Sequence, residues 1–261
     1  MFSLFILVLL PFLVSGECDS HPEPANGVLV DSIWIPGGKA IRCAYGYVPL
    51  GSGLATCDDD VWSEILECDE AVAMLVGGDE EDGYSDRVEV FSTSSTCMKP
   101  PALPHSAHGA AGGWVGGMAV VCGGEPEPFA MSSLCFAYSP ETNTWVDAPQ
   151  LKIARSMLSA AVLDGAMLVT GGYNEEYYST ALTELWIPGL AGLDTPWVES
   201  DPLPKTRSDH CSAVMADAAG LSVIVTGNYP ETPAVNSAET NKLVVGEDGT
   251  FTWSSLPVSI Q

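Results

Sequence analysis

Side chains that could do chemistry are sparse in this sequence, and the densest group of them is acidic. Residues 79–86 read "DEEDGYSD", with four acidic residues in succession and Asp86 beyond them. Carboxylate oxygens in such a cluster suit Ca²⁺, but the spacing does not match an EF-hand loop. We therefore expect a solvated acidic loop, with calcium binding as the alternative. The sequence contains no catalytic triad, phosphate-binding loop or dinucleotide-binding fingerprint.

The eight cysteines are unevenly distributed along the chain. Four lie within residues 18–68, and the other four are spread from Cys97 to Cys211. Four cysteines in about fifty residues suit a domain too small to be stabilised by its core alone, and they allow three pairings that the residues leave open. Cys122 and Cys135 fall on what should be adjacent antiparallel strands, so we expect them to form a disulfide. Cys97 and Cys211 have no evident partner.

The first sixteen residues predict export. An apolar run from Leu4 to Val14 is interrupted only by Pro11, and two small residues follow it. This pattern is typical of a secretory signal peptide, although no Lys or Arg precedes the run. A bilayer span needs about 20 apolar residues, and no later stretch reaches that length. We expect residues 1–16 to be removed and the rest to be secreted, without a membrane span, where disulfides can form.

The charge balance excludes several classes of partner. The chain has 9 basic and 34 acidic residues, a formal net charge of -25. Nucleic acids, heparin-like polyanions and anionic membrane surfaces would be repelled. The simplest interpretation is an acidic, soluble surface, and the alternative is attraction to a basic partner or to calcium. Hydrophobic residues make up 46% of the chain, which is enough for a substantial core.

The cysteine-dense segment carries a recognisable pattern. "PANG" follows Cys18, "CAYGY" begins at Cys43, "ATC" ends at Cys57, and Trp62 lies six residues before Cys68. Over residues 17–69 this resembles a sushi domain, also called a complement control protein module. The resemblance implies the pairs Cys18–Cys57 and Cys43–Cys68, with Trp62 and Tyr47 in a small core between the bridges. It also implies a role in binding other proteins.

The remaining chain repeats one landmark four times. Apolar runs end in glycine at "AMLVGG", "AVVCGG", "AMLVTGG" and "SVIVTGN", and the last pair has changed to Gly-Asn. The glycines concerned are Gly77, Gly78, Gly123, Gly124, Gly171, Gly172 and Gly227. A second landmark follows each run, in the order Cys97, Trp145, Trp197 and Trp253. Recurrence at about 50 residues indicates stacked structural units.

Each unit has the pattern of short strands. Asp164 and Gly165 separate two apolar runs and predict a tight hairpin, and "SPETN" at 139–143 separates two more. Four short antiparallel strands per unit describe a propeller blade. The double glycine, Tyr138 and then Trp145 resemble the kelch repeat. Over residues 70–261 the resemblance implies a partial β-propeller of about four blades, so the expected fold class is all-β.

The glycines and tryptophans have structural explanations in such a fold. The strand before each glycine pair would be buried on both faces, because neighbouring blades pack against each sheet. The chain must then turn sharply under a neighbouring blade, and glycine permits the positive φ and the close approach. The tryptophans would fill the wedge between blades.

A kelch-type propeller can also host an enzyme, since galactose oxidase resembles this fold and uses copper. The available histidines are His21, His105, His108 and His210. His108 and His210 fall on the expected innermost strands of two blades, where the kelch pattern itself often carries a histidine, and we identify no matching tyrosine ligands. We therefore expect no catalysis and no cofactor.

The expected ring of blades does not close. The first blade begins at Ala71 on its second strand, and only "VSIQ" follows Pro257. Propellers have about 4–8 complete blades, whereas here the first blade lacks its innermost strand and the chain after Pro257 is too short to supply it. We therefore expect an incomplete version of a longer protein or a fragmentary gene model. The sequence thus predicts a secreted protein that recognises an extracellular protein ligand through loops on one propeller face. The alternatives are an enzyme of the galactose-oxidase type and a carbohydrate-binding protein.

Overall fold

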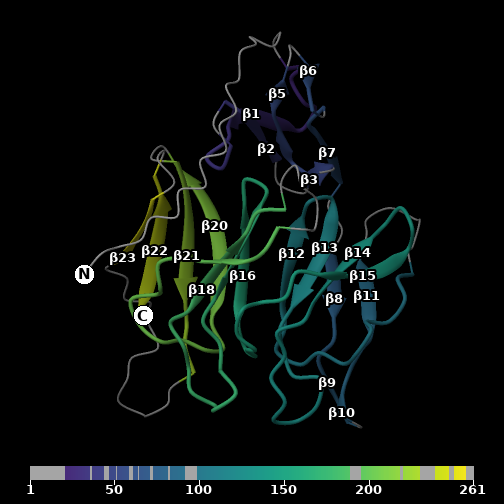
Figure 1. Ribbon diagram of the computed structural model, residues 1–261, viewed down its shortest axis with the longest axis vertical. Coiled ribbons are helices and arrows are strands. Elements are labelled where there is room, and N and C mark those ends of the chain that lie inside the picture. Colours follow the sequence, from purple (N-terminus) through teal and green to yellow (C-terminus); the bar gives the residue numbers. More distant parts are fainter. Residues whose placement is uncertain are drawn as a thin grey trace.

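The computed structural model describes most of the chain, in a series of ranges (Figure 1). These are residues 21–35, 37–43, 47–50, 52–58, 61–63, 65–70, 73–81, 83–91, 99–188, 195–217, 220–229, 239–246 and 250–256. Their regular elements are all strands, and none of these ranges contains a helix able to cross a membrane. The predicted signal segment 1–16, Cys18 and Cys97 lie outside the described residues.

The N-terminal unit is a set of short strands around a small core. Its strands are β1 (Gly27–Asp31), β2 (Lys39–Cys43), β3 (Tyr47–Leu50), β4 (Leu54–Ala55), β5 (Cys57–Asp58), β6 (Val61–Trp62) and β7 (Glu67–Glu70). They form three small sheets, in the orders β1-β2-β4, β3-β7 and β5-β6. Trp62 packs against the buried Ile41, Ala55 and Leu66, as the sequence predicts. The side chain of Tyr47 lies outside the described residues.

Disulfides stabilise this unit. Cys43 on β2 is bonded to Cys68 on β7, one of the two pairs that the sushi resemblance implies. Cys57 on β5 is also disulfide-bonded, whereas its expected partner Cys18 lies outside the described residues. A core of so few buried residues gains stability from such cross-links, because they restrict the unfolded chain.

Three four-stranded antiparallel sheets follow a smaller first one. The first comprises β8 (Ala73–Val76) and β11 (Val88–Phe91), with the hairpin β9 (Asp79–Glu80) and β10 (Gly83–Tyr84) between them. The second contains β12 (Ala111–Val115), β13 (Met118–Cys122), β14 (Cys135–Ser139) and β15 (Thr144–Ala148). The third contains β16 (Ser159–Leu163), β17 (Ala166–Thr170), β18 (Thr183–Trp186) and β19 (Val198–Glu199). The fourth contains β20 (Cys211–Asp217), β21 (Gly220–Thr226), β22 (Thr240–Val245) and β23 (Phe251–Leu256).

These sheets are arranged as blades of a partial β-propeller (Figure 1). The first strands of the second, third and fourth sheets, β12, β16 and β20, contact one another in succession. Within each sheet the strands pair in chain order. The turn chemistry expected from the sequence is present, since Asp164 and Gly165 both have positive φ, 44° and 75°, between β16 and β17. A two-residue turn of this kind matches the twist of the hairpin strands.

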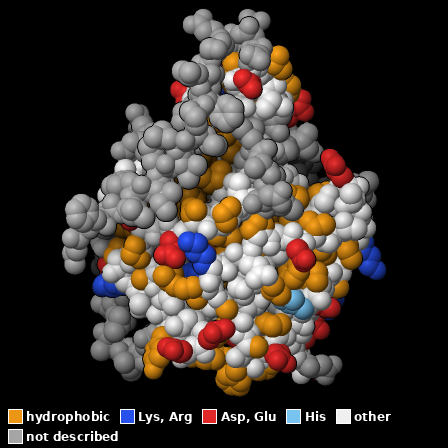
Figure 2. Space-filling view, viewed as in Figure 1, with side chains coloured by type: hydrophobic (Ala, Val, Ile, Leu, Met, Phe, Trp, Pro, Cys, Tyr) orange, Lys and Arg blue, Asp and Glu red, His pale blue; other side chains and the backbone are white. Residues whose placement is uncertain are grey.

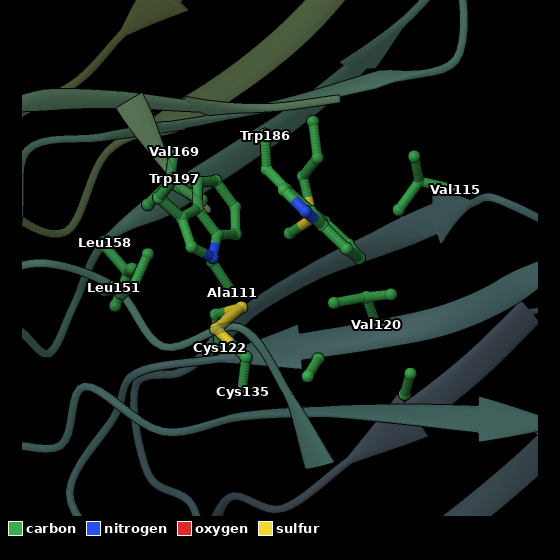
Figure 3. Close-up of a cluster of buried hydrophobic side chains, with 13 residues drawn as sticks. Ala111, Val115, Val120, Cys122, Cys135, Leu151, Leu158, Val169, Trp186 and Trp197 are labelled. Atoms are coloured by element: carbon green, nitrogen blue, oxygen red, sulfur yellow. A yellow bond between two sulfur atoms is a disulfide. The ribbon is translucent and has the colours of Figure 1, made fainter. Parts of the chain in front are cut away.

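The main cores lie between adjacent sheets rather than within one. Between the second and third sheets, Trp186 and Trp197 pack with Leu158, Val169 and the Cys122–Cys135 disulfide (Figure 3). Cys122 and Cys135 are register partners on β13 and β14, so the disulfide crosses neighbouring strands as expected. A second apolar cluster lies between the third and fourth sheets. Each sheet is therefore stabilised by its neighbours.

One expectation about the repeated strands holds only in part. All five residues of β17 are buried, as a strand between two sheets should be. In β8, by contrast, half-buried residues alternate with exposed ones, and the side chain of Leu75 is 60% exposed. The physical reason is that Val76 packs against Leu103, Ala107 and Phe136, whereas Leu75 belongs to no hydrophobic cluster of the described residues.

The N-terminal unit sits against one end of the propeller sheets (Figure 1). Arg42 donates two hydrogen bonds of 2.9 Å to the carboxylate of Asp164, which lies in the turn between β16 and β17. The indole of Trp34 donates to the carbonyl of Leu163, and the indole of Trp114 donates to that of Pro49. The hairpins at this end of the sheets are thus partly covered.

Candidate functional site

The glycine pairs link each sheet to the next. The N–H of the second glycine donates to a backbone carbonyl just before the first strand of the following sheet. The three bonds are Gly78 to Ala107 at 2.8 Å, Gly124 to Arg155 at 2.8 Å and Gly172 to Arg207 at 2.7 Å. The residue after each pair is thereby brought beside the loop that precedes the next sheet.

These repeated positions surround a cavity of about 270 Å³ at the end where β9 and β10 lie (Figure 1). Glu125 and Tyr173 follow two of the glycine pairs, and Tyr229 follows the equivalent Gly227–Asn228 pair. The remaining lining residues come from the loops before the first strands, from the loops after the glycine pairs and from the strand β10. They are His108, Met157, Asp209, Tyr84, Pro128, Phe129 and Tyr177. The cavity is close to the lower limit of about 300 Å³ for drug-sized ligands, so it suits a small group.

Local backbone geometry orients the lining residues. Met157 and Asp209 have a φ of 50°, and Gly109 has a φ of 64° at the equivalent position of the preceding sheet. Because this left-handed residue recurs in three sheets, it belongs to the fold. Tyr177 has a φ of 61° in a loop where the side chain of Asn174 accepts hydrogen bonds from two backbone N–H groups. Such an Asx turn fixes the loop that carries Tyr177.

A carboxylate forms the floor of the cavity. Glu125 is only 5% exposed. One of its oxygens accepts a hydrogen bond of 2.8 Å from the hydroxyl of Ser156. The other lies 3.4 Å from the hydroxyls of both Tyr84 and Tyr177, which is long for an O–H···O bond. Glu125 forms no ion pair with any residue that the structure describes.

The pKa values of the two tyrosines beside Glu125 are both raised. Burial raises the pKa of Tyr84, and the adjacent negative charge of Glu125 raises it further. Burial also raises the pKa of Tyr177, with Glu125 as the next contribution. Both hydroxyls therefore remain protonated at neutral pH and are available as donors toward the carboxylate.

Aromatic rings form the walls and rim of the cavity. The Tyr84 ring stacks on the His108 ring with centroids 4.4 Å apart, and Phe129 and Tyr177 lie 5.5 Å apart. The rim is open to solvent: Phe129 is 80% exposed and Tyr229 is 57% exposed. Figure 2 shows hydrophobic and acidic side chains gathered at this end of the molecule. An exposed aromatic cluster around a concavity is unusual for a surface without a binding role.

The histidines that the sequence singled out are not on the innermost strands. His108 lies three residues before β12, where it forms an isolated bridge with Glu125, and its ring lines the cavity. His210 directly precedes β20, and its Nε2 lies 2.8 Å from the hydroxyl of Thr170 on the neighbouring sheet. The prediction placed both on strands because the apolar runs begin near them. In the structure the strands begin at Ala111 and Cys211.

The acidic segment 79–86 is only partly a loop. Asp79 and Glu80 pair with Gly83 and Tyr84 in the β9–β10 hairpin, and the hydroxyl of Ser85 donates to Glu80 at 2.7 Å. Within the described residues no three His, Cys, Asp or Glu side chains are grouped so as to hold a metal ion. Asp82 lies outside the described residues.

The remaining predicted residues occupy the positions that define the repeat. Trp145, Trp197 and Trp253 lie on or beside the fourth strand of their sheets. Each indole donates to a backbone carbonyl near the end of the preceding sheet, on Pro101, Pro149 and Asp201 respectively. Only Trp197 is fully buried in the wedge, whereas Trp145 and Trp253 are half-buried. Cys211 is a free, exposed thiol.

Sequence reasoning missed two buried arginines and the site carboxylate. Arg155 donates to the carbonyl of Gly171 and to the carboxylate of Glu184, and both side chains are almost inaccessible to solvent. Arg207 makes the equivalent bond to Gly227. The available signal was the Arg-Ser pair repeated at 155–156 and 207–208. For Glu125 the signal was its place directly after a glycine pair.

Comparisons with known proteins bear on the fold alone. No protein-family model matches the chain. No curated protein matches it either. Among solved structures, the protein called YjhT is similar, with a TM-score of 0.53 and 16% sequence identity. The similarity covers 71% of this chain and 65% of the YjhT chain, so this chain matches slightly less than two thirds of that structure.

Proposed function

We propose that this chain is a secreted protein that binds another extracellular protein, without catalysis, through the end of the propeller that carries the aromatic cavity. Residues 1–16 would be its signal peptide, residues 17–69 a sushi-type module and residues 70–261 a partial kelch-type propeller. The disulfides support an oxidising compartment, because such bonds persist outside the cytosol.

The observation that carries this proposal is the exposed aromatic rim. Phe129 and Tyr229 line the cavity, and Tyr178 directly follows the lining residue Tyr177; all three side chains are more than half exposed. Aromatic residues are enriched at protein interfaces, because each ring buries a large area at low cost in side-chain entropy. Loops held by a rigid sheet scaffold are also the usual place for such contacts.

The test uses two rim substitutions and a matched control. The double variant Phe129→Ser with Tyr178→Ser removes two exposed rings, and Val61→Ser removes an exposed apolar side chain of the N-terminal unit, which is 67% exposed. We expect wild type and Val61→Ser to retain the same extracellular proteins in a quantitative pull-down. The rim variant should lose at least one of them by about tenfold or more. Equal retention by all three proteins would contradict the proposal.

A further inference from the structure

The chemistry of the cavity floor narrows the class of ligand. A buried carboxylate is costly unless it is paired with a positive charge or well hydrogen-bonded. Glu125 has one short hydrogen bond, from Ser156, while the tyrosine hydroxyls near its other oxygen lie at 3.4 Å. Neither arginine nor lysine lines the cavity. Glu125 is therefore buried without a charged partner among the described residues, and two long contacts from tyrosine hydroxyls are the only ones its second oxygen makes with described side chains.

The walls of the cavity also favour a positively charged ligand. Tyr84, Tyr173 and Tyr177 present aromatic rings around the carboxylate, and Tyr173 and Tyr177 have centroids 6.2 Å apart. Aromatic faces attract organic cations through the negative potential of the ring. Asp209 adds a second acidic side chain to the lining. The aromatic faces and the carboxylates thus both attract a positively charged ligand.

A neutral sugar fits this lining less well. The tyrosine hydroxyls of the lining can donate to a sugar, but a neutral ligand leaves the charge of the buried Glu125 uncompensated, whereas a cation compensates it. The net charge of -25 also attracts cations toward the molecule over a longer range. Carbohydrate binding is therefore an outcome that the experiment must separate from cation binding.

We propose that this cavity binds a compact organic cation, with its positive charge beside Glu125 and its alkyl part between the aromatic rings. Resting on the proposed function, the natural occupant is a lysine or arginine side chain of the partner protein. The cavity volume of about 270 Å³ suits one such side chain rather than a larger ligand.

The experiment measures small probes directly. Ligand-observed NMR titration would compare n-butylammonium and n-butylguanidinium with the neutral 1-pentanol and with galactose. We expect one or both cations to bind, with affinity falling as the salt concentration rises, and the two neutral probes to bind at least tenfold more weakly. The difference between the two cations identifies whether lysine or arginine is preferred.

Three variants assign the binding to the cavity. Glu125→Gln removes the charge with little change in shape and should weaken cation binding about tenfold or more. Glu127→Gln makes the same change two residues away, where the side chain is exposed and outside the lining, and should leave binding within twofold. If Glu125→Gln does not fold, Tyr229→Ser at the exposed rim should still weaken binding, because it removes one ring face.

The outcomes separate this inference from the proposed function. Absence of cation binding, equal binding by the Glu125→Gln variant, or equal binding of a neutral probe would overturn the cation site. Protein capture that depends on the rim would leave the proposed function standing in each of these cases. Cation binding at Glu125 without any rim-dependent protein capture would instead overturn the proposed partner and support a free small-molecule ligand.

Discussion

At the scale of single residues, burial decides the behaviour of the ionisable groups. His210 is 6% exposed and lies near Arg207 and Arg155. Burial, together with the smaller effects of the positive charges of Arg207 and Arg155, lowers the pKa of His210 to about 4. The neutral imidazole is thus the form that fits between the third and fourth sheets.

This shift predicts that the protein loses stability on mild acidification. Between the unfolded pKa of about 6.5 and the folded pKa of about 4, the unfolded chain binds a proton that the folded chain does not. The stabilising contribution of the neutral His210 to the folded state is therefore complete above about pH 6.5, and it disappears as the pH falls toward 4. We expect a loss of roughly 3 kcal/mol in the free energy of unfolding, measured by denaturant titration at each pH. In the His210→Gln variant the free energy of unfolding should fall less between pH 6.5 and pH 4. If it falls as steeply as in the wild type, the pH dependence does not come from His210.

At the scale of elements, the junctions between sheets matter more than any one sheet. The glycine pairs, the tryptophans and the buried arginines each join one sheet to a neighbour or to its own glycine turn. At Gly171 an added Cβ would lie 2.6 Å from the carbonyl oxygen of Arg207. Backbone of the next sheet cannot move away without breaking the bond from Gly172.

Replacement of Gly171 by alanine should therefore be strongly destabilising. Gly116 has a similar φ, 62° against 57°, but its nearest contact would be the side chain of Pro188 at 3.3 Å. Gly116→Ala should cost about 1–2 kcal/mol through backbone strain alone. We expect Gly171→Ala to cost at least about 2 kcal/mol more, because the clash adds to the strain. Equal melting temperatures for the two variants would show that the close approach is not limiting.

At the scale of the whole molecule, the two ends of the propeller differ. The N-terminal unit contacts one end through Arg42, Trp34 and Trp114, and the aromatic cavity lies at the other. The Asp164 side chain is 1% exposed, so the bidentate bond from Arg42 compensates a buried charge. The contact leaves the aromatic end as the accessible loop surface.

Loss of the Arg42 contact should loosen this docking without unfolding either part. Arg42→Met leaves Asp164 without its guanidinium, whereas Lys39→Met on the same strand removes only a pair with Asp31 inside the N-terminal unit. We expect backbone amides of residues 162–165 to exchange hydrogen about tenfold faster in Arg42→Met, equivalent to about 1.4 kcal/mol. The Lys39→Met rate should match wild type. Similar rates in all three proteins would indicate that the indole contacts suffice.

The sequence by itself determined the all-β fold, the repeated strands and the local turns. Those features depend on residues close in the chain: the Asp164–Gly165 hairpin, the Cys122–Cys135 disulfide across a thirteen-residue separation, and the glycines that end apolar runs. Short-range patterns of apolar residues and turn formers are sufficient for them.

Only the tertiary structure decided which distant side chains meet. Glu125 lies beside Tyr84 and Tyr177, which are 41 and 52 residues away, and Arg42 reaches Asp164 across 122 residues. Each of these residues follows ordinary local chemistry in its own segment, and no pattern in the sequence links the partners. Their proximity follows from how the sheets stack and how the N-terminal unit docks, which is set by packing over the whole molecule.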